Sequence, residues 1–426
     1  MVYRIKKVIS VHFPEIFEKF ETLPDIRKRK EYLIAEIVTA GLFLFIFKEG
    51  SRNQFNNDRR DAIFSKNYQR NFHLRLPHPD SIDEVMCVLP TKLLEKLKAE
   101  LVAHLIEQKC FRTYRLLGKY YFVAVDATGI QTFNKRHCEH CLTKTSKNNV
   151  VTYFHYVLEA KLVTSAGHSI SLASEFVENQ SDVNFDKQDS EQKAFVRLSK
   201  KIKKHFPRLP ICILADGLYP NNTVFGICKE YDWRFIITLK DGNLKTFNTE
   251  ANLLKITAKS QLVHRADKCF KTALEYKYLN DIEYDKKYYS WISCMETKTN
   301  IKDQSINEKS FVYITDLPQT NETVITVADG GRLRWKIENE GFNTQKNLGY
   351  EMEHKYSRSS YVAMKNYYQL LQIAHMINQF VEKTKAFVEL LNTCSGETIK
   401  SLWIDLNVFM KTIPVTDAQR IAFLSS

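Results

Sequence analysis

Two aspartates of this chain each follow a short run of apolar residues that is typical of a buried strand. Asp126 comes directly after residues 120–125 (YYFVAV), and Asp216 comes directly after residues 211–215 (ICILA). We expect each strand to stop at its aspartate, so that both carboxylates lie at one edge of a sheet. Carboxylate oxygens are the ligands that hard cations such as Mg²⁺ prefer. A lone aspartate in this position is more often a turn or cap residue, so the prediction depends on the pair.

A site that transfers phosphoryl groups with two metal ions needs a third acid, because two aspartates leave the set of ligands incomplete. Residues 332–346 (RLRWKIENEGFNTQK) supply Glu338 and Glu340 in a segment that we expect to be helical. Residues two apart on a helix point to opposite sides, so only one of these glutamates can face the aspartates. We choose Glu338 as the third acid.

The sequence around the aspartates also predicts the elements that position them. After the first strand we expect, in chain order, strands at 150–163 and 168–177, a helix from a capping box at Asp189 and Gln192 to about His205, the strand before Asp216, a helix from near Asn221 or Asn222, and a strand at 233–239. Lysines should lie on the exposed face of the first of these helices, at Lys200, Lys201, Lys203 and Lys204. This order is typical of an α/β domain of the RNase H-like kind, in which helices flank a mixed sheet.

The segment that contains Glu338 resembles the signature of the IS-four-like insertion-sequence family of DDE transposases. In that signature Tyr, two residues, Arg, three residues, Glu, six residues and Lys lie on one helix. Arg334 and Glu338 match it, and the string from Arg334 to Glu338 (RWKIE) is typical of the family. The resemblance covers roughly residues 118 to 380.

Two positions depart from this signature. Gly331 stands where the family has tyrosine, and Gln345 stands at the lysine position, with Lys346 displaced by one residue. On an ideal helix Gln345 returns to the face of Glu338, whereas Lys346 points about 80° away. A local distortion of the helix near Gly341 would be required to bring Lys346 to that face.

The resemblance implies an enzyme that binds insertion-sequence ends and catalyses metal-dependent cleavage and strand transfer of DNA. Asp126, Asp216 and Glu338 would ligate two Mg²⁺ ions, with Mn²⁺ as an alternative, and Arg334 and Lys346 would contact DNA. The implied partners are terminal inverted repeats, target DNA and a second copy of the chain in a synaptic homodimer. Two alternatives stay open: an RNase H-like nuclease without strand transfer, and an inactive transposase-derived DNA-binding protein.

The chain divides into four parts on the basis of pattern. Residues 1–115 should form a helical, DNA-binding region with basic clusters at 27–30 and 59–60, and its apolar stretch at 37–47 should be a buried helix. Residues 116–242 hold the first part of the catalytic core, and residues 243–325 form a β-rich insertion. Residues 326–426 complete the core with the Glu338 helix, which should continue to about Lys385, and with C-terminal helices.

Composition sets the broad class of the protein. The 62 Lys and Arg residues against 49 Asp and Glu give a formal net charge of +13, which favours a polyanionic partner, although a lysine-rich solvated surface would give the same balance. The nine cysteines are an odd number behind an N-terminus without a secretory pattern, which indicates a reducing cytoplasm and no disulfide framework. No run of apolar residues is long enough to span a bilayer, so no membrane association is expected.

Three further features receive structural interpretations. Residues 137–141 (HCEHC) contain four side chains that can bind Zn²⁺, but the spacing is poor for a zinc knuckle, so a polar hairpin tip is the preferred interpretation and zinc the alternative. Trp335 and Phe342 are expected in the core. Trp291 is also expected in the core, rather than stacked on a flipped base.

Overall fold

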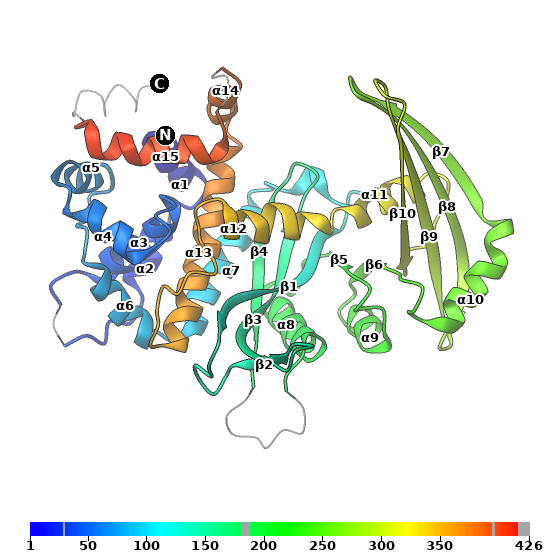
Figure 1. Cartoon of the computed structure of the whole chain (residues 1–426), viewed down its shortest axis with the longest axis horizontal. Helices are drawn as coiled ribbons and strands as arrows, with labels where there is room; N and C mark the ends of the chain where they lie inside the picture. Colours follow the sequence, from blue (N-terminus) through cyan, green and yellow to red (C-terminus); the bar gives the residue numbers. More distant parts are fainter. Residues whose placement is uncertain (29, 180–187, 394–396, 416–426) are drawn as a thin grey trace.

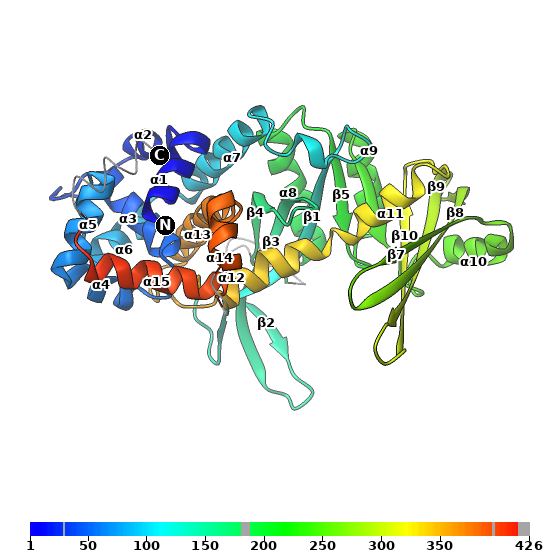
Figure 2. The same ribbon diagram turned by 90° about the horizontal axis from the view of Figure 1, so that it is seen from above.

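In the part of the chain that the structure describes, one mixed sheet of ten strands extends from the middle of the molecule to one end, with helices packed against it (Figure 1). The computed structural model describes residues 1–28, 30–179, 188–393 and 397–415. Helices from both ends of the chain gather at one end of the molecule, and strands β7 to β10 lie at the other end (Figures 1 and 2). The predicted α/β class, with a mixed sheet between helices, is confirmed at this level of detail.

Seven α-helices and a short 3₁₀-helix precede the sheet, and the described residues of this region contain no strand. They are α1 (Val2–His12), α2 (Ile16–Glu21), α3 (Ile34–Ile46), α4 (Arg52–Arg60), α5 (Ala62–Phe72), α6 (Pro79–Val88), α7 (Thr91–Glu107) and η1 (Arg112–Tyr114). Helix α3 is the predicted apolar helix, and its residues from Ala35 to Ile46 are all buried. A helix that is apolar on every side belongs in a core, and α3 packs against α13 (Tyr361–Glu382).

The centre of the sheet combines antiparallel and parallel pairs. Its strands are β1 (Tyr121–Phe133), β2 (Leu142–Thr145), β3 (Val151–Val163), β4 (Ser169–Val177), β5 (Ile211–Ala215) and β6 (Arg234–Thr238). Strand β3 pairs antiparallel with β1, β2 and β4, while β1, β5 and β6 are parallel neighbours. The parallel strands are connected through α8 (Glu191–His205) and α9 (Asn222–Glu230).

Strand β1 does not stop at Asp126, so that prediction is wrong. The strand continues seven residues further, to Phe133, because β3 pairs with it along this whole length, from Val123 opposite Leu162 to Phe133 opposite Tyr153. Strand β5 ends at Ala215, as predicted. Its neighbour β1 extends past this point, to Phe133.

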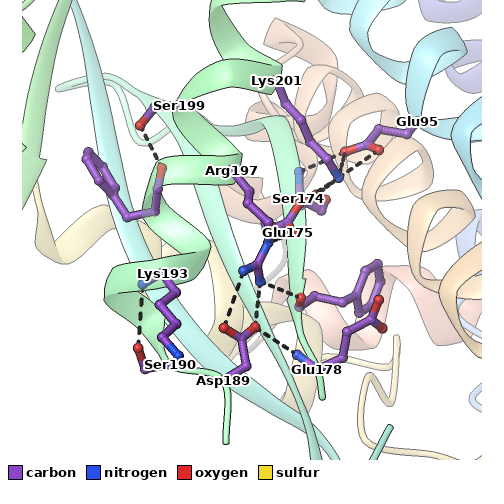
Figure 3. Close-up of polar contacts among 12 residues, drawn as sticks. Glu95, Ser174, Glu175, Glu178, Asp189, Ser190, Lys193, Arg197, Ser199 and Lys201 are labelled. Carbon is purple, nitrogen blue, oxygen red and sulfur yellow. Dashed lines mark hydrogen bonds and ion pairs between the residues drawn. The ribbon is translucent and has the colours of Figure 1, made fainter. Parts of the chain in front are cut away.

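Helix α8 begins one residue later than its predicted capping box implies. Its N-cap is Ser190, whose hydroxyl accepts a hydrogen bond from the Lys193 amide. Asp189 instead pairs with Arg197, and the same guanidinium group also pairs with Glu175 on β4 (Figure 3). The carboxylate of Asp189, which was expected to cap the helix, therefore forms an ion pair with Arg197 instead.

The lysine face of α8 is only partly solvated. Lys201 forms ion pairs with Glu95 on α7 and with Glu175 on β4, so it fastens the helix to its neighbours (Figure 3). Lys200 and Lys204 are exposed, as predicted.

Residues 245–315 contain one helix, one 3₁₀ turn and four long strands that extend the same sheet. These elements are α10 (Lys245–Leu254), η2 (Lys255–Thr257), β7 (Lys259–Ala266), β8 (Phe270–Tyr284), β9 (Lys287–Asn300) and β10 (Ile306–Thr315). Strand β10 pairs antiparallel with β6, so the sheet continues without a break from β6 to β7.

The helical segment predicted from residue 332 to about 385 is interrupted. The elements are α11 (Val324–Arg332), the π-helix η3 (Ile337–Asn343), α12 (Thr344–Asn347), α13 (Tyr361–Glu382), α14 (Lys385–Thr393) and α15 (Ile399–Thr412). Residues 348–360 between α12 and α13 are not helical, and Gly349 there has a φ of +91°, which favours glycine. Among the described residues, no helix is long and apolar enough to cross a membrane.

Candidate active site

Asp126 lies within β1, and Asp216 directly follows the end of the parallel neighbour β5. The register of β1 and β5 pairs Tyr121 with Ile211 and Ala124 with Leu214. The same register, continued by two residues, places Asp216 opposite Asp126. Neighbouring strands are about 4.8 Å apart and paired residues point to the same face, so this continued register puts the two residues next to each other at the end of β5, where both act on the electrostatics of Tyr156 and Tyr219.

The segment that contains Glu338 crosses the sheet directly above β1, and two glycines allow this close approach. A β-carbon at Gly330 would lie 2.6 Å from the ring of Phe122 on β1, and one at Gly331 would lie 2.8 Å from the ring of Tyr313 on β10. A side chain at either position would require the ring or the helix to shift. The ring of Tyr313 also fills the space next to Gly331, where the transposase signature has a tyrosine.

Arg334 connects the first and third acids of the predicted site. Its Nη1 lies 2.8 Å from Oε1 of Glu338 and 3.3 Å from Oδ2 of Asp126. The side chain of Arg334 is only 9% exposed, whereas those of Asp126 and Glu338 are 23% and 37% exposed. One guanidinium group therefore holds two carboxylates, from strand β1 and from η3, at a partly open site.

The carboxyl group of Asp126 has an unusual environment. Burial raises its pKa from 3.8 to about 7, with a further contribution from the neighbouring Glu338, while the Ala127 amide and Arg334 act in the opposite direction. A carboxyl group in this state gains more from an added counter-charge than a solvated one does. A divalent cation would supply such a charge.

The side chain of Asp216 is more exposed than that of Asp126. Its Oδ1 accepts a hydrogen bond of 2.8 Å from the Leu218 amide, which is the arrangement of an Asx turn, and Lys240 lies 3.4 Å from its Oδ2. The side chain is 33% exposed. The turn fixes one oxygen and leaves the other with an exposed lysine as its partner.

Sequence reasoning missed a fourth acid, Glu191, in the first turn of α8. Its two oxygens accept hydrogen bonds from Tyr156 (3.1 Å) and Tyr219 (3.3 Å). Burial raises the pKa of Glu191, and the charge of Asp216 adds to the effect. Asp126 and Asp216 both act electrostatically on the same two tyrosines, which places all three acids in one region. The local sequence marks Glu191 only as a helix start, so its proximity to the aspartates could not be inferred.

Glu340 belongs to a different surface. It forms an ion pair with Lys336, one turn before it, and it lies near Gly167 in the turn between β3 and β4. In the described part of the chain, no hydrogen bond or ion pair joins Glu340 to either aspartate. This arrangement agrees with the choice of Glu338 over Glu340.

The helix distortion that Lys346 requires is present as the π-helix η3. The five steps from Glu338 to Asn343 turn by roughly 80° each in the π-helix, and the three steps to Lys346 turn by about 100° each in α12, a total of about 700°, so the eighth residue rather than the seventh returns close to the starting face. Gln345 is accordingly buried, with hydrogen bonds to Gln372 and His375. Lys346 is partly exposed and forms an ion pair of 2.7 Å with Glu353.

The aromatic predictions have mixed outcomes. Phe342 and Trp291 are buried, as predicted, at 6% and 3% exposed. The prediction for Trp335 is wrong, because this side chain is 49% exposed. The guanidinium carbon of Arg334 lies 4.5 Å from the centre of its ring. Trp335 therefore presents an open aromatic surface beside the acids.

Of the two N-terminal basic clusters, the first is partly used within the fold. Arg27 forms an ion pair of 2.8 Å with Asp25 and donates to the Tyr32 carbonyl, while Lys28 and Lys30 are exposed. Arg29 lies outside the described residues. In the second cluster Arg59 is partly buried and Arg60 is exposed.

Among the described residues, the ligand atoms of Asp126, Asp216 and Glu338 do not all lie within 4.8 Å of one another, so the acids have the chemistry of a site for a hard, oxygen-seeking metal without its closed geometry. Asp126, Asp216 and Glu338 offer only carboxylate oxygens, which suit Mg²⁺ or Mn²⁺ and not a soft metal. In the structure, Arg334 supplies the positive charge next to Asp126 and Glu338 that a metal ion would otherwise supply. No family model matches the chain, and no curated protein matches it.

Proposed function

We propose that this chain is a DDE transposase of the IS-four-like kind, with Asp126, Asp216 and Glu338 as the ligands of two Mg²⁺ ions. The observation that carries the proposal is that acids from two distant segments, Asp126 and Glu338, share the buried guanidinium group of Arg334. The register of β1 and β5, continued past its last pair, supports a position for Asp216 next to Asp126.

The order of the strands supports an RNase H-like interpretation of the core. Strands β4, β3, β1, β5 and β6 are neighbours in that order, with an antiparallel meander on one side of β1 and parallel strands on the other. Asp126 then lies on β1, and Asp216 lies at the end of β5, its parallel neighbour in the middle of this order. The third comes from a helix packed on that face.

The proposed reaction is an in-line displacement at phosphorus. In the first step a water oxygen attacks a phosphodiester, and the 3′-oxygen leaves and takes up a proton. In the second step that 3′-hydroxyl loses its proton and attacks a phosphodiester of the target DNA, whose own 3′-oxygen leaves. Bound Mg²⁺ would activate the attacking oxygen and stabilise the leaving one. Asp126, Asp216 and Glu338 hold the ions, and Arg334, once released from the acids, offsets charge on the phosphate.

The proposed substrate is DNA, and three features around the acids suit it. Lys240 lies beside Asp216, Lys346 adds a partly exposed positive charge on the helix that follows η3, and Trp335 offers an exposed ring on which a base can stack. The net charge of +13 favours phosphate neutralisation over the rest of the surface. In this proposal two copies of the chain hold paired inverted repeats.

Cleavage and binding assays on the same DNA test the proposal. The probe is a labelled fragment that carries the inverted repeats flanking the coding sequence. Asp126→Asn, Asp216→Asn and Glu338→Gln should each lower Mg²⁺-dependent nicking by at least about a hundredfold, because the hard cation loses a charged ligand. Gel-shift affinity at fixed salt should remain, since it comes from Lys and Arg contacts to phosphate.

Glu340→Gln is the matched control, because Glu340 lies away from the aspartates and pairs with Lys336. It should nick DNA normally. If Glu338→Gln is active and Glu340→Gln is inactive, the third acid is wrongly assigned, and if every variant is active the whole site is wrong. Joined products from paired ends would distinguish a transposase from a nuclease that only hydrolyses DNA.

A further inference from the structure

Two cysteines and a histidine form a tight cluster at the far end of β1. Cys138 and Cys141 lie in the loop between β1 and β2, and His155 lies on β3. The two Sγ atoms are 3.7 Å apart, and Nε2 of His155 lies 3.6 Å from Sγ of Cys138 and 3.7 Å from Sγ of Cys141. Three soft or borderline ligand atoms thus form a nearly equilateral triangle.

These distances are the ones that tetrahedral zinc requires. With Zn–S bonds of about 2.3 Å and Zn–N bonds of about 2.0 Å, tetrahedral geometry places two sulfurs about 3.8 Å apart and a sulfur and a nitrogen about 3.5 Å apart. The observed triangle matches both values without any movement of the backbone. Close packing of thiols alone would not require an imidazole nitrogen at the third corner.

A fourth ligand is available from the same loop. One ring nitrogen of His137 lies within 4.8 Å of the ligand atoms of Cys138 and His155. The Nε2 of His137 also lies 2.8 Å from the Arg358 carbonyl oxygen. Cys141 is not part of this 4.8 Å group, so the ring of His137 would move toward Cys141 to complete a set of two cysteines and two histidines, which is a common set for structural zinc.

We propose that Cys138, Cys141, His155 and His137 form a structural Zn²⁺ site that is separate from the acid cluster. The donors are thiolates and neutral imidazoles, which select zinc over the hard cations proposed for the acids. The inference does not depend on the proposed function, because it uses none of the acidic residues.

The position of the site indicates what the zinc would hold together. The ring of His140, in the same loop, stacks on Tyr361 with 4.6 Å between the ring centres, and the ring of His155 lies 4.7 Å from that of Tyr361. Tyr361 is the first residue of α13, the central helix of the core. Zinc would therefore fix the end of β1, the strand that carries Asp126, to β3 and to the start of α13.

The test measures the metal content of the full chain, purified in reductant without a metal-binding tag and supplied with Zn²⁺ before gel filtration. Elemental analysis should find about one zinc per chain. Cys138→Ser/Cys141→Ser should retain less than about a tenth of that amount, because zinc needs the thiolates. The control is Cys269→Ser, which removes an exposed thiol outside the cluster and should keep the zinc.

A second measurement protects the test against a variant that fails to fold. Co²⁺ added to the wild-type chain should produce thiolate-to-metal charge-transfer absorption and the visible bands of tetrahedral Co²⁺, and Zn²⁺ should displace it. His137→Asn should weaken Co²⁺ binding by about ten- to a hundredfold without removing these bands. The proposal is overturned if the wild-type chain binds neither metal, if the double serine variant keeps its zinc, or if mass spectrometry shows a Cys138–Cys141 disulfide in the reduced protein.

Discussion

Replacing Arg334 with methionine should destabilise the metal-free protein, and Mg²⁺ should restore much of the loss. The guanidinium group neutralises Asp126 and Glu338 at 3.3 and 2.8 Å, in a site where its own side chain is 9% exposed. Breaking a fully buried pair costs about 3–5 kcal/mol, and a surface pair contributes about 0–1 kcal/mol. Because the two acids are partly exposed, we expect the free energy of unfolding to fall by about 2 kcal/mol.

Added Mg²⁺ should stabilise Arg334→Met more than the wild type, because the cation no longer competes with the guanidinium group for the same oxygens. A ligand at ten times its Kd stabilises the folded state by about 1.4 kcal/mol. Thermal unfolding with and without Mg²⁺ measures the effect. The double variant Arg334→Met/Glu338→Gln should recover part of the metal-free stability, since one of the two acids is neutral, but it should lose the response to Mg²⁺.

Arg332→Met is the matched control for this experiment. Arg332 lies two residues earlier and pairs with Glu296 at 2.7 Å, away from the acids. Its replacement should lower the melting temperature without an added response to Mg²⁺. Equal responses to Mg²⁺ in the wild type, Arg334→Met and Arg332→Met would refute the argument that Arg334 occupies the place of a metal.

Two further predictions concern charge elsewhere in the chain. Burial, followed by the charge of Asp58, raises the pKa of Glu49 from 4.5 to about 9. Between these two pKa values the folded chain keeps a proton that the unfolded chain releases. As the pH rises through this range, Glu49 therefore lowers the free energy of unfolding by about 1.4 kcal/mol per pH unit. Glu49→Gln should thus melt close to the wild type at pH 5 and clearly above it at pH 8, and parallel melting curves across pH would contradict this. Lys346→Gln should weaken DNA binding and reduce the slope of log affinity against log salt by about 1. Glu353→Gln frees Lys346 from its ion pair and should strengthen DNA binding. An unchanged slope in both variants would exclude Lys346 as a phosphate contact.

The sequence predicted the parts of the fold that depend on local pattern. Strand β5 ends before Asp216 because an apolar run meets a polar turn, and α9 begins at the predicted Asn221 cap. The end of β1 was predicted wrongly because its pairing partner β3 decides where it stops, and that pairing is not visible in the run of residues 120–125. Asp189 was assigned as a cap for the same reason, since its partner Arg197 becomes visible only in the folded chain.

The candidate site was predictable to the extent that a motif marked it. Arg334 and Glu338 stand at helical spacing, and their contact in the structure is the one that such spacing allows. The helix distortion at η3 could be anticipated only as a requirement for Lys346, and nothing in the sequence marked Trp335 as exposed. His155 was missed as a partner of Cys138 and Cys141, because a strand brings it to a loop that precedes it in the chain by more than a dozen residues.

The most direct test of the proposed site is to locate Mn²⁺ in crystals of the protein by anomalous diffraction. Mn²⁺ prefers the same oxygen ligands as Mg²⁺, and its anomalous signal identifies it. We expect Mn²⁺ bound to Asp126, Asp216 and Glu338, with Arg334 displaced from the acids. Once DNA is present, we expect two ions about 4 Å apart. Crystals soaked in Mn²⁺ that show no ion on these carboxylates, with Arg334 still between Asp126 and Glu338, would contradict it.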